Sequence, residues 1–171
     1  EAAVTEKTCA ILIEPVQGEG GVTAMSAEYL RGLRALCDKH GVLWVADEVQ
    51  CGMGRTGKFF AFEHFNVIPD ITALAKSLGG SKCAMAAMIA RTEIYMKAYG
   101  NPKKAMIHAP ATFGGLGEAC ATSIEALNVL YDEDLIGNAA TQGAYLIERL
   151  EALKVKYPSI IKDVRGQGLM V

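Results

Sequence analysis

The sequence has 171 residues, of which 51% are hydrophobic and 21% are charged, so it holds enough apolar side chains for a buried core and does not fit a disordered chain. Its 17 Lys and Arg residues balance 19 Asp and Glu residues without forming a basic block, which argues against nucleic acid or a membrane surface as a partner. No apolar run approaches the roughly 18–20 residues of a membrane span, and the five cysteines are scattered, so we expect a cytoplasmic protein with reduced cysteines.

The first part of the chain predicts a strand, a helix and a second strand. Cys9–Ile13 is a short apolar run that leads into Glu14 and Pro15, which indicates a strand that stops at the proline. Ser26 is a predicted N-cap, leucines follow it at helical spacing, and Gly41 is the predicted end of that helix. Val42–Ala46 is apolar on both faces, which is typical of a central parallel strand. Together these elements predict a right-handed βαβ unit.

The rest of the chain continues the alternation of strands and helices. Ile71–Ala75 and Ala84–Ala90 are apolar runs that predict two more strands. Residues from Gly117 to Tyr157 predict two helices with a break near 132–134, and Asp163–Val171 predicts the first strand of a further unit. The order of elements predicts an α/β fold with a doubly wound, mostly parallel sheet flanked by helices.

Two predicted strands run into side chains that can do chemistry. Val42–Ala46 leads into Asp47 and Glu48, at the strand end where doubly wound sheets bind ligands. A buried Asp47 would need a cation or several donors, although an aspartate here can also simply cap a turn. Lys76 follows Ile71–Ala75 and precedes small residues, so it could be a desolvated nucleophilic amine, or a surface lysine.

The glycine cluster Gly52–Lys58 matches two phosphate-binding patterns, G-x-G-x-x-G and G-x-x-x-x-G-K. Neither context fits, because several residues separate the cluster from its strand and Phe59 stands where a phosphate loop needs Ser or Thr. The sequence favours a flexible turn that lines a site, with a nucleotide-binding module as the alternative. The three histidines have no metal-ligand spacing, and no H-E-x-x-H or G-x-S-x-G motif is present, so no metal site is predicted.

Five stretches of the chain, in the same order, resemble the class III (ω-amino) aminotransferases, which are pyridoxal 5'-phosphate (PLP) enzymes of fold type I. The matching stretches are Ile13–Gly21, Leu36–Gly57, Phe62–Gly80, Ala111–Gly115 and Val164–Met170. The likeness is greatest to putrescine and ornithine-type transaminases, and it departs from the family pattern at Ser81–Ala86 and Leu116–Glu118. It implies transfer of an amino group, expected to be a terminal one from a diamine or ω-amino acid, to a 2-oxo acid. A PLP-dependent mutase or decarboxylase of the same fold is the alternative.

The resemblance implies a role for each residue that matches the family's cofactor site. Lys76 would be the Schiff-base lysine that holds the cofactor and moves the proton. Asp47 would face the pyridine nitrogen and keep it protonated. Val49 would pack on one face of the ring, and Gln50 would donate toward its phenolic oxygen.

The resemblance also implies an assembly and a division of the chain. Thr112 would bind the cofactor phosphate of the neighbouring subunit in a homodimer, and Glu19 would pair with a substrate-binding arginine beyond Val171. Residues 1–133 would be the central part of the PLP-binding large domain, and residues 134–171 the connecting helix and first strand of an incomplete C-terminal small domain. Since the family's N-terminal phosphate-binding turn has no counterpart here, we expect the isolated chain to retain cofactor weakly and to be inactive.

Overall fold

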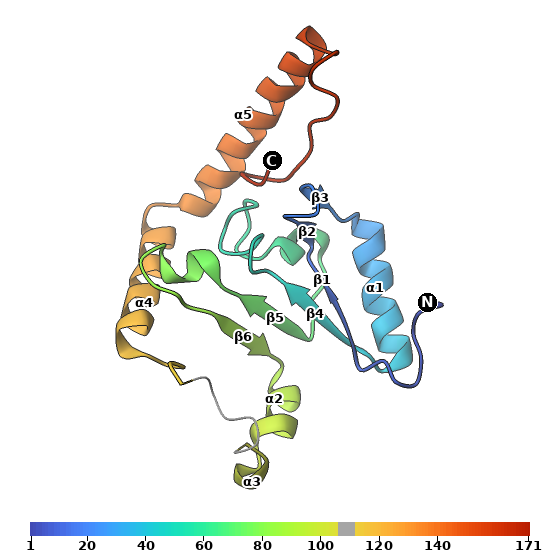
Figure 1. Cartoon of the computed structure of the whole chain (residues 1–171), viewed down its shortest axis with the longest axis vertical. Helices are drawn as coiled ribbons and strands as arrows, with labels where there is room; N and C mark the ends of the chain where they lie inside the picture. Colours follow the sequence, from blue (N-terminus) through green and yellow to red (C-terminus); the bar gives the residue numbers. More distant parts are fainter. Residues whose placement is uncertain (106–111) are drawn as a thin grey trace.

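The computed structural model describes residues 1–105 and 112–171 and is built on a four-stranded sheet of order β1-β4-β5-β6. The strands are β1 (Ala10–Ile13), β4 (Leu43–Asp47), β5 (Ile71–Leu74) and β6 (Ala87–Ala90). β1, β4 and β5 run parallel, and β6 pairs antiparallel with β5 at the edge (Figure 1). The predicted α/β fold with a mostly parallel sheet is confirmed, and each predicted strand of this sheet appears within a few residues of its expected bounds.

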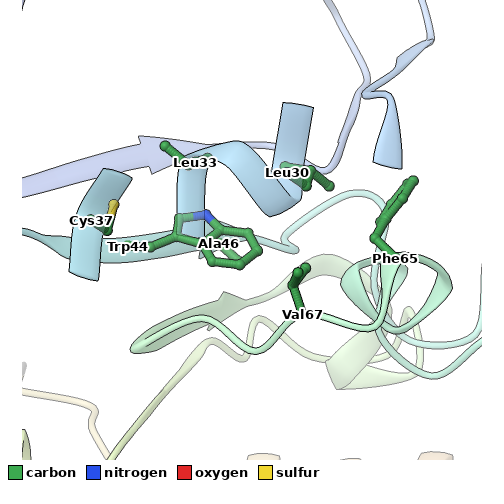
Figure 2. Close-up of a cluster of buried hydrophobic side chains, with 7 residues drawn as sticks. All are labelled: Leu30, Leu33, Cys37, Trp44, Ala46, Phe65 and Val67. Atoms are coloured by element: carbon green, nitrogen blue, oxygen red, sulfur yellow. The ribbon is translucent and has the colours of Figure 1, made fainter. Parts of the chain in front are cut away.

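Helix α1 (Ala27–His40) joins β1 to β4 and forms for the local reasons that the sequence indicates. The Ser26 hydroxyl accepts a hydrogen bond from the backbone N–H of Tyr29 at 3.0 Å, and Gly41 ends the helix in the left-handed conformation. The buried face of α1 packs on β4 around the fully buried Trp44, as Figure 2 shows. This cluster is the main core and consists of Leu30, Leu33, Cys37, Trp44, Ala46, Phe65 and Val67.

The remaining elements lie around this sheet. They are β2 (Val16–Gln17), β3 (Thr23–Ala24), the 3-10 helices η1 (Ala61–Phe65) and η2 (Lys76–Gly79), and the helices α2 (Thr92–Tyr99), α3 (Pro102–Ala105), α4 (Gly117–Asp132) and α5 (Leu135–Lys156). The predicted break between the last two helices is confirmed, because Asp134 adopts a left-handed conformation there and caps α5 by accepting the N–H of Gly137. Figure 1 shows α5 projecting away from the sheet, with the C-terminal segment folding back along it. In the described ranges, no helix is long and apolar enough to cross a membrane.

The prediction of a strand within Asp163–Val171 is wrong. The backbone instead forms a tight turn, in which the N–H of Gln167 donates to Met170 O at 2.9 Å and the N–H of Met170 donates to Gln167 O at 3.1 Å. Gly166 and Gly168 both have positive φ, which turns the chain too sharply for a strand. We call residues 166–170 the C-terminal turn.

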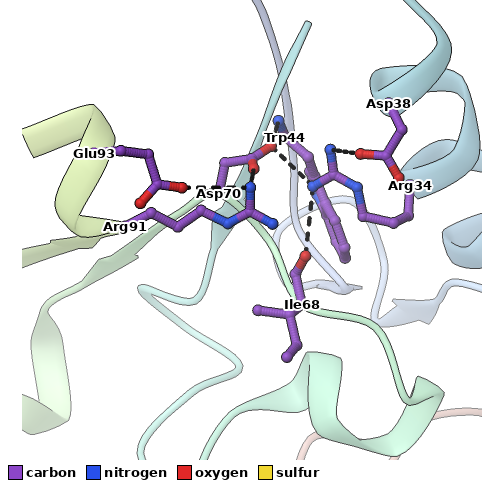
Figure 3. A network of polar contacts seen from close by, with 7 residues as sticks. All are labelled: Arg34, Asp38, Trp44, Ile68, Asp70, Arg91 and Glu93. Carbon is purple, nitrogen blue, oxygen red and sulfur yellow. Dashed lines mark hydrogen bonds and ion pairs between the residues drawn. The ribbon is translucent and has the colours of Figure 1, made fainter. Parts of the chain in front are cut away.

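An ion-pair network around the buried Asp70 fixes the end of β5 that lies away from Lys76. Asp70, immediately before β5, is 4% exposed and accepts hydrogen bonds from the backbone N–H of Trp44 at 2.7 Å and from Arg34 at 2.8 Å. Arg91, which precedes α2, lies 3.0 Å from the other carboxylate oxygen (Figure 3). One side chain thus joins α1, β4, β5 and the start of α2.

Candidate functional site

Asp47 and Lys76 are brought to the same edge of the sheet by the parallel pairing of β4 with β5. Asp47 is the last residue of β4 and lies opposite Ala73 of β5. Lys76 follows the end of β5 and begins η2. Asp47 is partly buried, and its Oδ1 accepts the backbone N–H of Val49 at 3.0 Å. The carboxylate and the amine therefore leave neighbouring strands at the end where α/β sheets bind ligands.

Lys76 has a backbone conformation that residues with side chains seldom adopt. Its φ is +48°, in the left-handed region, and Ala75 before it is fully extended. Such conformations cost about 1–3 kcal/mol and cluster at functional sites. The side chain is exposed, and its amine forms no hydrogen bond or ion pair with any residue in the described ranges. Where the chain is described, the Lys76 amine thus has no structural partner, and its backbone bends sharply at the end of β5.

A pocket of about 300 Å³ brings Lys76 and Gln50 together. Its other lining residues are Val22, Arg55, Ser77, Leu169, Met170 and Val171. This volume is at the lower end of the range of small-molecule sites, and the lining combines apolar walls with a few polar groups, as such sites do. Lys76 also lines a second hollow, of about 440 Å³, together with Ala75 and Cys83–Ala86.

The remaining predicted site residues do not line the pocket of Lys76 and Gln50. Asp47 and Val49 are partly buried and lie just before Gln50 in the sequence. Glu19 is exposed on the loop between β2 and β3, and Thr112 is exposed at the start of the segment that leads to α4. The structure therefore unites two of the predicted cofactor residues in one pocket and places Asp47 on the adjoining strand end.

Glu48 is a buried site-supporting residue that the sequence indicated only as a second carboxylate after β4. Its side chain is 1% exposed and accepts the N–H groups of Ala61 at 2.9 Å and Phe62 at 3.0 Å. The Cys51 thiol donates to the same carboxylate at 3.4 Å. Burial raises the pKa of the Glu48 carboxyl, while the two backbone donors oppose that rise. Glu48 therefore anchors the turn that carries Gln50 to the start of η1.

The glycine cluster Gly52–Lys58 serves as a packing surface in this structure. A Cβ added at Gly57 would lie 2.8 Å from Ala140, and one added at Gly54 would lie 2.9 Å from Ile136, so both glycines contact α5 closely. Arg55 O accepts the N–H of Leu169 at 2.9 Å, which docks the C-terminal turn on the cluster. The cluster is followed by the 3-10 helix η1 and not by the longer helix that a dinucleotide or phosphate loop opens.

The histidines show no arrangement for metal binding where the chain is described. His40 pairs with Glu1, and His64 contacts Thr56 at 3.1 Å. Burial lowers the pKa of His64. Within residues 1–105 and 112–171, no three His, Cys, Asp or Glu side chains form a group that could hold a metal ion, and His108 lies outside the described residues.

Comparison with known proteins decides the family. A family model described as aminotransferase class III matches residues 1–171. The chain belongs to the class III aminotransferases. It is 44% identical over 165 residues to a putrescine aminotransferase of Pectobacterium atrosepticum, covering 96% of this chain and 34% of that protein. The family that the sequence motifs indicate is thus confirmed.

Solved structures of class III aminotransferases resemble the fold closely. An ornithine aminotransferase from Plasmodium yoelii superposes with a TM-score of 0.85 at 42% identity, over 94% of this chain and 41% of that one. An amine transaminase from an uncultivated Pseudomonas species, in a PLP-bound form, superposes with a TM-score of 0.87 at 38% identity, over 93% of this chain and 36% of that one. This class III aminotransferase chain therefore spans 34% of the length of the curated relative and about two fifths or less of these two structures.

Proposed function

We propose that the protein carrying this sequence is a PLP-dependent aminotransferase that moves an amino group, preferably a terminal one of a diamine or ω-amino acid, to a 2-oxo acid. The observation that carries the proposal is the Lys76 amine, which has no hydrogen-bond or ion-pair partner among residues 1–105 and 112–171 and shares a pocket with Gln50 at the strand edge. Membership of the class III family supports it. The preference for a terminal amine follows relatives that are named for putrescine and ornithine.

The residues at this edge fit the cofactor. PLP needs an amine for its aldehyde carbon, an acid for its pyridine nitrogen and a donor for its phenolic oxygen, and Lys76, Asp47 and Gln50 supply these groups. Bound there, the cofactor supplies an electron sink for the substrate carbon that loses a proton. Lys76 would hold the cofactor through its amine, and its Nζ would carry the proton from the substrate carbon.

The other residues of the site orient the cofactor. The Asp47 carboxylate keeps the pyridine nitrogen protonated while its Oδ1 stays bonded to the N–H of Val49. Val49 packs on one face of the ring, and the Gln50 amide donates to the phenolic oxygen. Hydrogen bonds from neutral groups of this kind contribute about 0.5–1.5 kcal/mol each.

The assembly and the division of the chain follow the same proposal. Thr112, which is exposed here, binds the cofactor phosphate of the neighbouring subunit in a homodimer. Glu19 pairs with a substrate-binding arginine. Residues 1–133 form the central part of the large domain, and residues 134–171 belong to the connection and the small domain. The five free cysteines favour a location in the cytoplasm, where thiols stay reduced. The 171 residues alone, without the rest of the protein, are inactive.

Absorbance spectroscopy of the full-length protein tests the role of Lys76. Addition of PLP to the wild type gives a yellow species that borohydride removes, and Lys76→Ala does not form it. Lys58→Ala, which changes an exposed lysine outside the pocket, keeps the band. A Lys76→Ala protein with the wild-type spectrum overturns the assignment.

Two further measurements separate the proposal from its alternatives. Consumption of 2-oxoglutarate or pyruvate with an amine donor distinguishes amino transfer from a mutase or decarboxylase reaction, which consumes no acceptor. Protection by Mg-ATP against thermal unfolding, lost in Lys58→Ala, would instead support a nucleotide-binding module at Gly52–Lys58. We expect acceptor consumption and no such protection.

A further inference from the structure

Gly18 is a buried residue in the loop between β2 and β3 whose backbone is held on both sides. Its N–H donates to Glu14 Oε2 at 3.0 Å. Its carbonyl oxygen accepts the N–H groups of Gly21 and Val22, each at 3.1 Å. Because the backbone N–H and C=O of Gly18 are both hydrogen-bonded, the backbone at residue 18 has little freedom to shift.

The amide of Gln50 occupies the space that a side chain at residue 18 would need. A Cβ added at Gly18 would lie 2.8 Å from Gln50 Nε2 and closer still to Cδ and Oε1, and these are the three nearest heavy atoms. Real Cβ atoms essentially never approach other atoms within 3.0 Å. A residue other than glycine at this position would therefore force one of the two groups to move.

The backbone conformation of Gly18 does not require glycine. Its φ is not in the left-handed region, so alanine could adopt the same backbone conformation, whereas Gly21 in the same loop has a φ of +98°. The obstacle is the end of a flexible side chain and not a backbone atom, so a substitution costs the fold little. The need for glycine here comes from the Gln50 amide.

The backbone that carries Gln50 is also fixed, so only its side chain can give way. The N–H of Gly52 donates to Glu48 O at 3.0 Å, and Val49 donates to the Asp47 carboxylate. Glu48 is held in turn by the backbone of η1. A methyl group at residue 18 would rotate the Gln50 amide away from the wall that it shares with Lys76.

We propose that Gly18 is a positioning residue for the cofactor site: its missing side chain leaves room for the Gln50 amide to lie in the pocket beside Lys76. This inference rests on the proposed PLP-dependent function, in which Gln50 donates to the cofactor. Gly18 itself lines no part of the pocket, so it acts only through Gln50.

A double-mutant cycle in the full-length protein tests the inference by PLP affinity and absorbance. Gly18→Ala and Gln50→Ala each weaken PLP binding by about tenfold, the loss of one hydrogen bond, and shift the cofactor band in the same direction. In the Gln50→Ala background, Gly18→Ala has no further effect. Gly32→Ala, in α1 with no heavy atom within 4 Å of its added Cβ, is the matched control and keeps wild-type affinity.

The outcomes separate this inference from the proposed function. Losses that multiply in the double variant overturn the role of Gly18, and so does wild-type affinity in Gly18→Ala. Wild-type affinity in Gln50→Ala overturns the proposed role of Gln50 itself, and the inference with it. If Gly18→Ala does not fold, removal of the Gln50 amide must restore the melting temperature, and a double variant that stays unfolded overturns the inference.

Discussion

The carboxylate of Asp70 accepts a hydrogen bond from the backbone N–H of Trp44, with Oδ2 2.7 Å from the nitrogen. Trp44 lies in β4 and Asp70 immediately precedes β5, so this bond joins the two strands that deliver Asp47 and Lys76. In a strand, a slip of one residue turns every side chain to the opposite face. Asp70 therefore helps to set the register on which the candidate site depends.

Replacing Asp70 by alanine should destabilise the protein by about 3–5 kcal/mol, because it removes the buried carboxylate that pairs with the largely buried Arg34 side chain and accepts the Trp44 N–H. Arg34 has a second partner, Asp38, whose side chain is 64% exposed. Asp38→Ala should therefore lower the free energy of unfolding by less than about 1 kcal/mol. Urea unfolding followed by Trp44 fluorescence measures both. Equal losses in the two variants would contradict this account of the network.

The buried Glu48 carboxyl should make stability depend on pH. Burial raises its pKa in the folded state above the ordinary value of 4.5, so the folded state binds the proton more tightly than the unfolded chain. The contribution of this carboxyl to the free energy of unfolding is greatest below about pH 4.5 and declines as the pH rises through the folded-state pKa. The free energy of unfolding of the wild type, minus that of Glu48→Gln, should therefore fall as the pH is raised above 4.5. A difference that grows with pH would show that the backbone donors outweigh burial.

Cys51 should resist alkylation in the folded protein. Its side chain is fully buried, and burial together with the nearby Glu48 carboxylate raises the pKa of the thiol, so the reactive thiolate is scarce at neutral pH. Cys9 is exposed and serves as the internal control. Peptide mass spectrometry after a brief treatment with iodoacetamide should find Cys9 modified and Cys51 modified only after denaturation. Equal labelling under native conditions would mean that the turn around Cys51 opens readily.

The parts of the fold that the sequence predicted well are those with local causes. The ends of α1 depend on a hydroxyl at Ser26 and a left-handed Gly41, both readable in the sequence. The hairpin of β2 and β3 was not predicted, because strands of two residues have no periodicity to detect. The turn at 166–170 was mistaken for a strand, because Gly168 packs against the glycine cluster and against Gly143 of α5, and these contacts are distant in the sequence.

The candidate site was predictable only in part for the same reason. An acid and an amine after neighbouring strands could be found in the sequence, but which of Asp47 and Glu48 is buried depends on the N–H groups of Ala61 and Phe62. The contact between Gly18 and the Gln50 amide joins two loops and leaves no local signal, so only the structure reveals it.

Asp47→Asn should separate the charge of Asp47 from its structural hydrogen bond. The amide oxygen of asparagine can still accept the N–H of Val49, which lies 3.0 Å from Oδ1, so the free energy of unfolding without cofactor should stay within about 0.5 kcal/mol of the wild type. The negative charge that holds a protonated pyridine nitrogen is lost, so PLP affinity should fall at least about tenfold, the equivalent of roughly 1.4 kcal/mol. Equilibrium dialysis and thermal unfolding measure the two effects. Asp47→Ala, which also removes the acceptor for Val49, should lose both affinity and stability. Wild-type affinity in Asp47→Asn would mean that the carboxylate only caps its turn, the alternative that the sequence left open.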